Sequence, residues 1–188
     1  MRCFIAIEID KELKREIQKI VSELKRSRAE IKWVSIEGFH LTLKFLGEIK
    51  EETAGEIEVR LREICKEHPE FSLSIKGTGV FPDYSRPRVL WIGIERSEAL
   101  HRLFESIEEE MEKLGFEKET RRFNPHITIG RVKSAKGIKE TIKDLRRYRE
   151  HNFGKIYVTG VSLMKSILKP TGAVYETICI APLKKEAR

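Results

Sequence analysis

Cysteines, amide side chains and long apolar runs are all scarce in this chain of 188 residues. The three cysteines, Cys3, Cys65 and Cys179, lie far apart and form no C-x-x-C pair, so the sequence indicates neither a disulfide framework nor a zinc knuckle. We expect buried, reduced thiols. The longest apolar runs, such as Cys3–Ile7 and Ile178–Ala181, fall short of the roughly 18 residues that a membrane-spanning helix needs. This excludes a membrane protein.

Gln18 and two asparagines are the only amide side chains, whereas Lys and Glu are abundant, a bias reported for heat-adapted proteins. The 37 Lys and Arg against 30 Asp and Glu leave a net charge of +7. This modest excess permits binding to a polyanion but does not demonstrate it. No targeting segment precedes the strand-like start at Arg2, so we expect a cytoplasmic protein, from a thermophilic source.

Short apolar strands and amphipathic helices are interspersed along the chain. Strands are expected at 3–9, 30–36, 39–46, 71–75, 89–95, 126–132, 155–164 and 173–181, with a Gly/Pro-rich loop at 77–87. Helices are expected at 11–24, 51–67, 97–114 and 137–149, with Asp10 and Ser97 as N-terminal caps. Several neighbouring strands lack a helix between them, which favours an α+β fold with antiparallel pairing in one compact domain, 1–188.

A weak internal repeat is the most informative feature. His40-Leu41-Thr42-Leu43 and His126-Ile127-Thr128-Ile129 share one pattern, each within an expected strand and 86 residues apart. Because side chains alternate between the faces of a strand, His and Thr project to one side and the aliphatic residues to the other. Two such strands side by side would bring two imidazoles and two hydroxyls into one cleft.

This set of groups suits a phosphodiester. Two histidines can hold opposite protonation states near neutral pH, so that one takes a proton while the other gives one. Each threonine hydroxyl can donate to a phosphoryl oxygen without adding charge. Either copy alone is more often an ordinary sheet residue, and a two-His metal site lacks the third protein ligand that metals usually require. We therefore expect catalysis by His40, Thr42, His126 and Thr128 with neither a metal nor a cofactor.

The paired motifs resemble the signature of the 2H phosphoesterase superfamily, and their context is similar to its RNA 2′,3′-cyclic phosphodiesterase branch, also called the 2′-5′ RNA ligase or LigT-like family. The resemblance covers roughly 1–182. It rests on Phe4–Ile7, Trp33-Val34, His40–Glu48, Pro87–Trp91 and Asn124–Arg131.

The resemblance implies a bilobal, pseudo-symmetric α+β fold whose antiparallel sheets line a central cleft, with helices outside. It implies hydrolysis of RNA-terminal 2′,3′-cyclic phosphates to 2′-phosphomonoesters, and reversible 2′-5′ ligation of tRNA halves in some members. We expect a monomer. By motif position, His40 would be the general acid and His126 the base that activates water. Thr42 and Thr128 would hold the phosphoryl oxygens. The residues themselves leave the acid and base assignment open.

Two charged residues follow the motifs. Strict alternation places Lys44 on the His40 face, where it would add positive charge as a substrate-binding residue. Gly130 occupies the matching position in the second copy and indicates room for substrate or a bulge. We hypothesise that such a bulge turns Arg131 back to the His126 face as a phosphate ligand; the alternative is a strand-end arginine in solvent.

The remaining candidates have no motif partner. His68, His101 and His151 are expected outside the site, and the basic run 143–149 is interpreted as a solvated helix face rather than an RNA contact. Phe81 and Tyr84 in the Gly/Pro loop would either stack on a base or anchor the loop. Two other functions remain open: an RNA-binding or tRNA-ligating protein, and a phosphodiesterase of small cyclic or 2′-5′-linked nucleotides.

Overall fold

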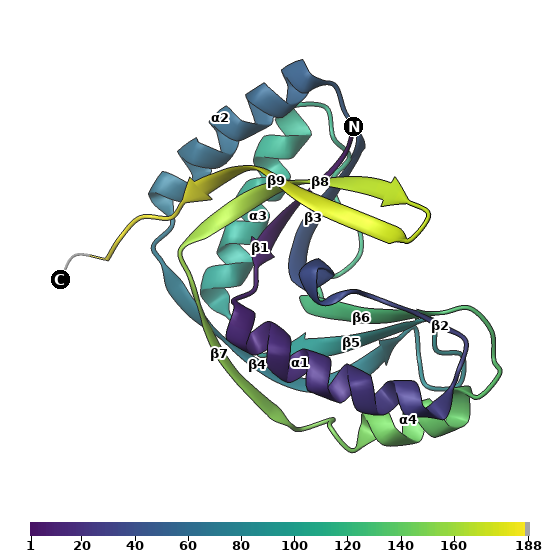
Figure 1. Cartoon of the computed structure of the whole chain (residues 1–188). Helices are drawn as coiled ribbons and strands as arrows, with labels where there is room; N and C mark the ends of the chain where they lie inside the picture. The colour runs from purple at the N-terminus through teal and green to yellow at the C-terminus, as the bar shows by residue number, and fades with distance from the viewer. Residues whose placement is uncertain (187–188) are drawn as a thin grey trace.

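The computed structural model describes residues 1–186 and consists of one twisted sheet with helices on one side (Figure 1). The strands are β1 (Arg2–Glu8), β2 (Ile31–Trp33), β3 (His40–Glu48), β4 (Phe71–Phe81), β5 (Val89–Ile94), β6 (His126–Val132), β7 (Asn152–Val158), β8 (Gly160–Lys169) and β9 (Gly172–Pro182). The helices are α1 (Lys11–Leu24), α2 (Glu51–Glu67), α3 (Glu98–Lys113) and α4 (Ile138–Arg146). The expected α+β fold with antiparallel pairing is confirmed.

The sheet has two halves, which we call lobes. Its strand order is β7-β4-β5-β6-β3-β1-β8-β9, with β2 paired to β6. The His40 lobe is β3-β1-β8-β9 with α2 and α3 packed on it, and the His126 lobe is β6-β5-β4-β7 with β2, α1 and α4 (Figure 1). The two expected sheets are therefore one continuous sheet, joined where β3 meets β6.

The helices begin where the sequence predicts. The Asp10 carboxylate accepts a hydrogen bond from the backbone N–H of Leu13, and the Ser97 hydroxyl accepts one from that of Leu100. Both caps satisfy a backbone donor that the first helical turn leaves free. The apolar stripe of each helix then packs on the sheet; in α1 it consists of Leu13, Ile17, Ile20, Val21 and Leu24.

The core lies between the helices and the face of the sheet that they cover. Aliphatic side chains from both lobes, such as Ile5, Leu41, Leu90 and Ile127, are fully buried in it. Burying each of these side chains contributes about 1.5–3 kcal/mol. The three cysteines are free and buried, as predicted. Within residues 1–186, no helix combines the length and apolar character that a membrane crossing requires.

Three segments differ from the prediction. The single strand expected at 155–164 is two strands, because the chain leaves β7 at Thr159 and crosses to the other lobe as β8. The strand expected at 30–36 is only β2, followed by a short 3-10 turn at Ile36–Gly38. Part of the loop expected at 77–87 is strand, since β4 continues to Phe81 by pairing with β5.

Candidate active site

The two His-x-Thr motifs meet where the lobes join. The Cα pair between β3 and β6 is Leu41 with Ile127. Because the strands run antiparallel, this register sets the His of each motif opposite the Thr of the other, and diagonal neighbours in such a ladder lie about 7–8 Å apart. The four side chains are His40, Thr42, His126 and Thr128. All four are half-buried, whereas the aliphatic residues of both motifs lie in the core.

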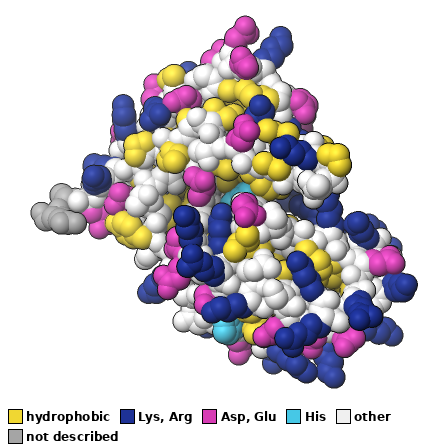
Figure 2. Space-filling model, in the orientation of Figure 1, with side chains coloured by type: hydrophobic (Ala, Val, Ile, Leu, Met, Phe, Trp, Pro, Cys, Tyr) yellow, Lys and Arg dark blue, Asp and Glu magenta, His cyan; other side chains and the backbone are white. Residues whose placement is uncertain are grey.

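The site opens on the face of the sheet that the helices leave free. Figure 2 shows a hollow between the two lobes, with histidine atoms at its base. The cleft expected between the motifs is therefore present, and a phosphoryl group between the strands would lie within reach of side chains from both.

Each motif is followed by a β-bulge. In the His40 lobe, Ala6 of β1 pairs with Thr42 but Ile5 pairs with Lys44, which leaves Leu43 as the extra residue. In the His126 lobe, the extra residue is Ile129, between Thr128 and Gly130. A bulge of this kind reverses the alternation of side chains beyond it. The residue two after each Thr therefore faces the core, and the residue three after it faces the cleft.

The bulge places Lys44 in the core, so its expected position on the His40 face is wrong. The Lys44 ammonium donates to both carboxylate oxygens of Glu108 in α3, at 2.9 and 3.0 Å, and to the carbonyl of Glu117 at 2.9 Å. Only 6% of the Lys44 side chain and 4% of the Glu108 side chain are exposed. Glu108 also accepts the backbone N–H of Glu119. The Lys44–Glu108 pair therefore holds the segment between α3 and β6, which leads to His126, against β3 and α3.

The bulge places Arg131 on the cleft side of β6, and its role as a phosphate ligand stays a hypothesis. It pairs with Val89 of β5, and Val89 shares its strand face with Trp91. The Trp91 ring centroid is 6.5 Å from that of His126. Arg131 is exposed at its end of the strand, and its charge helps to lower the pKa of His126.

His126 is oriented by a backbone carbonyl. Its Nδ1–H donates to the carbonyl oxygen of Asn124 at 2.7 Å, which leaves Nε2 as the proton acceptor. The Phe81 ring packs edge-on at 4.8 Å. Burial lowers the pKa of His126 below 6.5, the Asn124 carbonyl opposes this shift, and Arg131 adds to it.

His40 lies between two aromatic rings that sequence reasoning missed. Phe4 stacks on it with centroids 5.0 Å apart, and Tyr175 of β9 packs edge-on at 4.8 Å. Burial, with a smaller contribution from the Lys14 charge, lowers the pKa of His40 to about 4, while Glu8 acts in the opposite direction. The alternation of β1 could have indicated Phe4, but Tyr175 comes from a hairpin that only the tertiary fold brings near.

Other candidate residues lie elsewhere. His68 hydrogen-bonds to Ser106, and the rings of His101 and His151 contact phenylalanines. Tyr84 lies beneath the Arg146 guanidinium, 4.7 Å from it, so this tyrosine anchors its loop. The basic run 143–149 includes the last turn of α4, with only Leu145 fully buried. Among residues 1–186, no three His, Cys, Asp or Glu side chains gather as a metal site would require.

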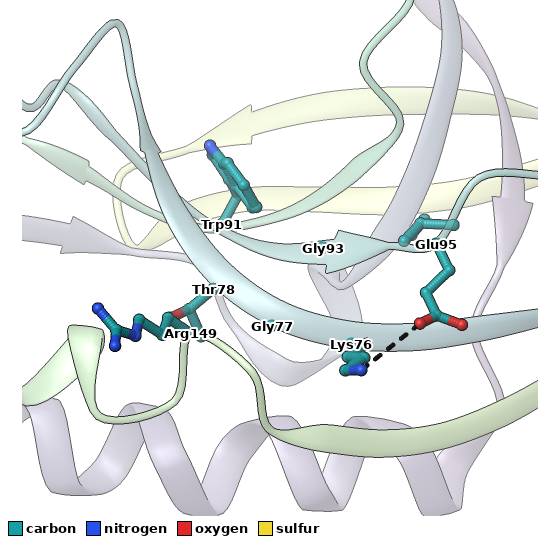
Figure 3. Close-up of a pocket in the computed structure, with 8 residues that line it drawn as sticks. Lys76, Gly77, Thr78, Trp91, Gly93, Glu95 and Arg149 are labelled. Atoms are coloured by element: carbon teal, nitrogen blue, oxygen red, sulfur yellow. Dashed lines mark ion pairs between the residues drawn. The ribbon is translucent and has the colours of Figure 1, made fainter.

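A shallow hollow adjoins the site at Trp91. Figure 3 shows Trp91 and Arg149 at one end, and the Lys76–Glu95 ion pair, 3.7 Å apart, at the other. The indole lies across Gly79, where a Cβ atom would approach Trp91 to 2.2 Å. Glycine at this position thus allows the ring that borders His126 to lie flat on β4.

A family model described as "LigT like Phosphoesterase" matches the chain twice, over residues 7–91 and 92–175. The chain belongs to the LigT-like phosphoesterase family. Each match contains one His-x-Thr motif, in keeping with the two similar half-sites.

Relatives and solved structures agree with this membership. The chain is 37% identical to the RNA 2′,3′-cyclic phosphodiesterase of Archaeoglobus fulgidus, over 95% of this chain and 98% of the relative. It is equally identical to the enzyme of that name from Thermotoga maritima, over 95% and 93%. The structure of TT0787 from Thermus thermophilus matches with a TM-score of 0.80 at 28% identity, over the whole of both chains. Escherichia coli LigT complexed with 3′-AMP shares the fold, with a TM-score of 0.78 at 24% identity over 97% of both chains.

Proposed function

We propose that this phosphoesterase hydrolyses RNA-terminal 2′,3′-cyclic phosphates to 2′-phosphomonoesters, without a metal ion, through His40 and His126. The observation that carries the proposal is the Leu41–Ile127 register, which sets both His-x-Thr motifs on one face. The names of relatives at 37% identity support the RNA substrate.

His126 acts as the base. Its Nε2 accepts the proton of the attacking water, because Nδ1 already donates to the Asn124 carbonyl. That carbonyl stabilises the imidazolium that forms, as a fixed acceptor does for catalytic histidines generally. Water then attacks phosphorus on the side opposite the 3′ oxygen.

His40 acts as the acid and protonates the departing 3′ oxygen, which leaves the phosphate on the 2′ hydroxyl. A pKa of about 4 makes its imidazolium a strong acid, although only roughly one molecule in a thousand carries that proton at pH 7 in the empty site. The anionic substrate favours the protonated form, because an opposite charge within a few ångströms raises the pKa of an imidazole.

Thr42 and Thr128 donate hydrogen bonds to the non-bridging phosphoryl oxygens, and Arg131 offsets their charge. These donors face the cleft from both strands, so they can stabilise the negative charge that develops on the oxygens in the transition state. Replacement of water by a 5′-hydroxyl in the same displacement would produce a 2′-5′ linkage. We propose this ligation of RNA ends, such as tRNA halves, as a secondary activity of a monomeric cytoplasmic enzyme.

Alanine substitutions test the histidine pair. His40→Ala and His126→Ala should each lower turnover of an oligonucleotide ending in a 2′,3′-cyclic phosphate by at least about 100-fold, the contribution of one positioned acid or base. The matched control is His101→Ala on the exposed face of α3, which should keep full activity. Activity should also persist in a chelator. Retained hydrolysis in either motif variant would refute the mechanism.

Product analysis tests the substrate class. Nuclease mapping should find the phosphate on the 2′ hydroxyl, and no reaction with cyclic ends would overturn the proposal. The same preparation, offered linear 2′-5′-linked nucleotides and small cyclic nucleotides, shows whether these are better substrates than RNA ends.

A further inference from the structure

Charge is divided unequally between the two lobes. Residues 11–39, 71–95 and 126–158, which make up the His126 lobe, contain 20 Lys and Arg but only 10 Asp and Glu. The remaining residues contain 17 and 20, completing the 37 and 30 of the whole chain. Figure 2 shows Lys and Arg side chains gathered over the lobe that carries α1 and α4. The net charge of +7 is thus the sum of a strongly basic lobe and a slightly acidic one.

Ion pairs are divided in the opposite way. In the His40 lobe, seven of the 16 Lys and Arg that the structure describes form an ion pair, against three of 20 in the His126 lobe. The paired cations of the His40 lobe are Lys44, Arg60, Arg62, Arg96, Lys113, Lys118 and Arg121. In the His126 lobe, three exposed cations beside the site have no ion pair within residues 1–186. We call Lys32, Arg131 and Lys133 the cationic strip. Their charge is therefore free to meet an anion.

The strip begins at Arg131, three residues beyond Thr128 on β6, and extends onto the neighbouring strand β2. Lys32 of β2 lies directly opposite Arg131 of β6, and Lys133 follows two positions after Arg131 on the same face. Ile31 and Trp33 on either side of Lys32, and Val132 between Arg131 and Lys133, pack against the core. By strand alternation, the three cations therefore lie on the opposite side, toward the cleft. Like charges directly opposite on neighbouring strands are destabilising, so an anion bound between them would relieve a cost that the free protein carries.

We infer that the cationic strip binds the phosphates of the RNA chain that precede its cyclic end. This inference rests on the proposed function. When the terminal phosphate lies between the two motifs, the polynucleotide attached to it must leave across one lobe. The His126 lobe offers unpaired cations on the strands that carry the site, whereas a larger share of the cations of the other lobe already have carboxylate partners. The strip thus makes the enzyme selective for oligonucleotides over mononucleotides.

The test is the double variant Lys32→Gln/Lys133→Gln, which leaves Arg131 in place. With a single-stranded RNA of about ten nucleotides ending in a 2′,3′-cyclic phosphate, kcat/KM should fall about tenfold at low salt. The slope of log(kcat/KM) against log(salt) should become shallower by about 1.4, since each lost single-strand phosphate contact removes about 0.7. With a nucleoside 2′,3′-cyclic phosphate, which has no preceding phosphate, kcat/KM should stay within about twofold.

The matched control is Lys50→Gln/Lys66→Gln, which removes two exposed lysines at the two ends of α2 in the other lobe. Neither lysine has an ion pair among the residues that the structure describes. The control should behave as the wild type does. The inference is overturned if kcat/KM of this control falls as much as that of the strip variant. It is also overturned if kcat/KM of the strip variant falls equally with the mononucleotide and the oligonucleotide, or falls with neither substrate.

A binding measurement separates this inference from the proposed function. Fluorescence anisotropy with the same RNA carrying a terminal 2′-phosphate requires no turnover. Weaker binding by the strip variant than by its control supports the inference, even if the cyclic end is not hydrolysed. Equal binding by both variants overturns it, even if hydrolysis and the histidine effects are as proposed.

Discussion

The two half-sites share a backbone but differ in chemistry. Each has a His-x-Thr motif on a strand, followed by a bulge that turns the third residue after Thr into the cleft. That residue is Phe45 in one copy, 69% exposed, and Arg131 in the other. Both imidazoles contact aromatic rings, but only His126 has a backbone carbonyl as a hydrogen-bond partner. The pKa of His40 is lowered to about 4, mainly by burial. A repeated scaffold thus presents two histidines on one face while giving each of them a different environment, as distinct acid and base roles would require.

An activated leaving group gives the sharpest test of that difference. An aryl phosphodiester such as bis(4-nitrophenyl) phosphate expels a stable anion that needs no proton. On this substrate, turnover by His126→Ala should still be at least about 100-fold below that of the wild type. Turnover by His40→Ala should be close to the wild-type rate, because its defect on RNA comes from the missing acid. Stopped-assay rates for both variants on both substrates measure this. Recovery in His126→Ala instead would reverse the acid and base assignment.

The residue that follows the bulge provides the next comparison, since Lys44 stands where the other copy has Gly130. Lys44→Met leaves Glu108 buried without its cation, which should lower the free energy of unfolding by about 3–5 kcal/mol. Adding Glu108→Leu should recover much of this loss, because both charges are then removed. Urea denaturation measures both effects.

The matched control for this variant is Lys113→Met. Lys113 forms an exposed pair with Glu110, so the loss should stay below about 1 kcal/mol. Equal losses in Lys44→Met and Lys113→Met would show that the buried pair does not hold the segment before His126.

Arg131 and Phe45 give the smallest expected effect. Both histidines have a pKa below 6.5, so a plot of kcat/KM against pH should be bell-shaped. The midpoints of both limbs should lie below pH 6.5, with the lower one near pH 4. Arg131→Gln removes a cation that lowers the pKa of His126, so protonation becomes easier and the upper limb should move to higher pH. We expect kcat/KM to fall about tenfold.

The matched variant at the equivalent position is Phe45→Leu, which changes no charge and should leave both limbs in place. An upper limb that does not move in Arg131→Gln would show that Arg131 does not act on His126.

The sequence was sufficient to place the two His-x-Thr motifs on one face of the sheet because both motifs obey strand periodicity. When the aliphatic residues that alternate with His and Thr enter the core, the strand has only one possible orientation. His and Thr must then both lie on the opposite face. The bulge after Thr128 was also foreseeable, since Gly130 is a recognised sign of one. The bulge after Thr42 was not, because Leu43 and Lys44 continue the alternation without a glycine, so the local pattern predicts the wrong face for Lys44.

Features that depend on distant pairing could not be predicted. The rings that contact His40 come from β1 and β9, and the sequence around His40 does not predict which residues they are. Nor does alternation through 155–164 show that the chain changes lobes at Thr159, since both strands bury similar aliphatic residues.

The exchange of strands between the lobes has a consequence for dividing the chain. The first repeat of the sequence contributes α1 and β4 to the His126 lobe, and the second contributes β8 and β9 to the His40 lobe. Cutting the chain between the repeats would therefore give two fragments, each missing the outer strands that close its own motif.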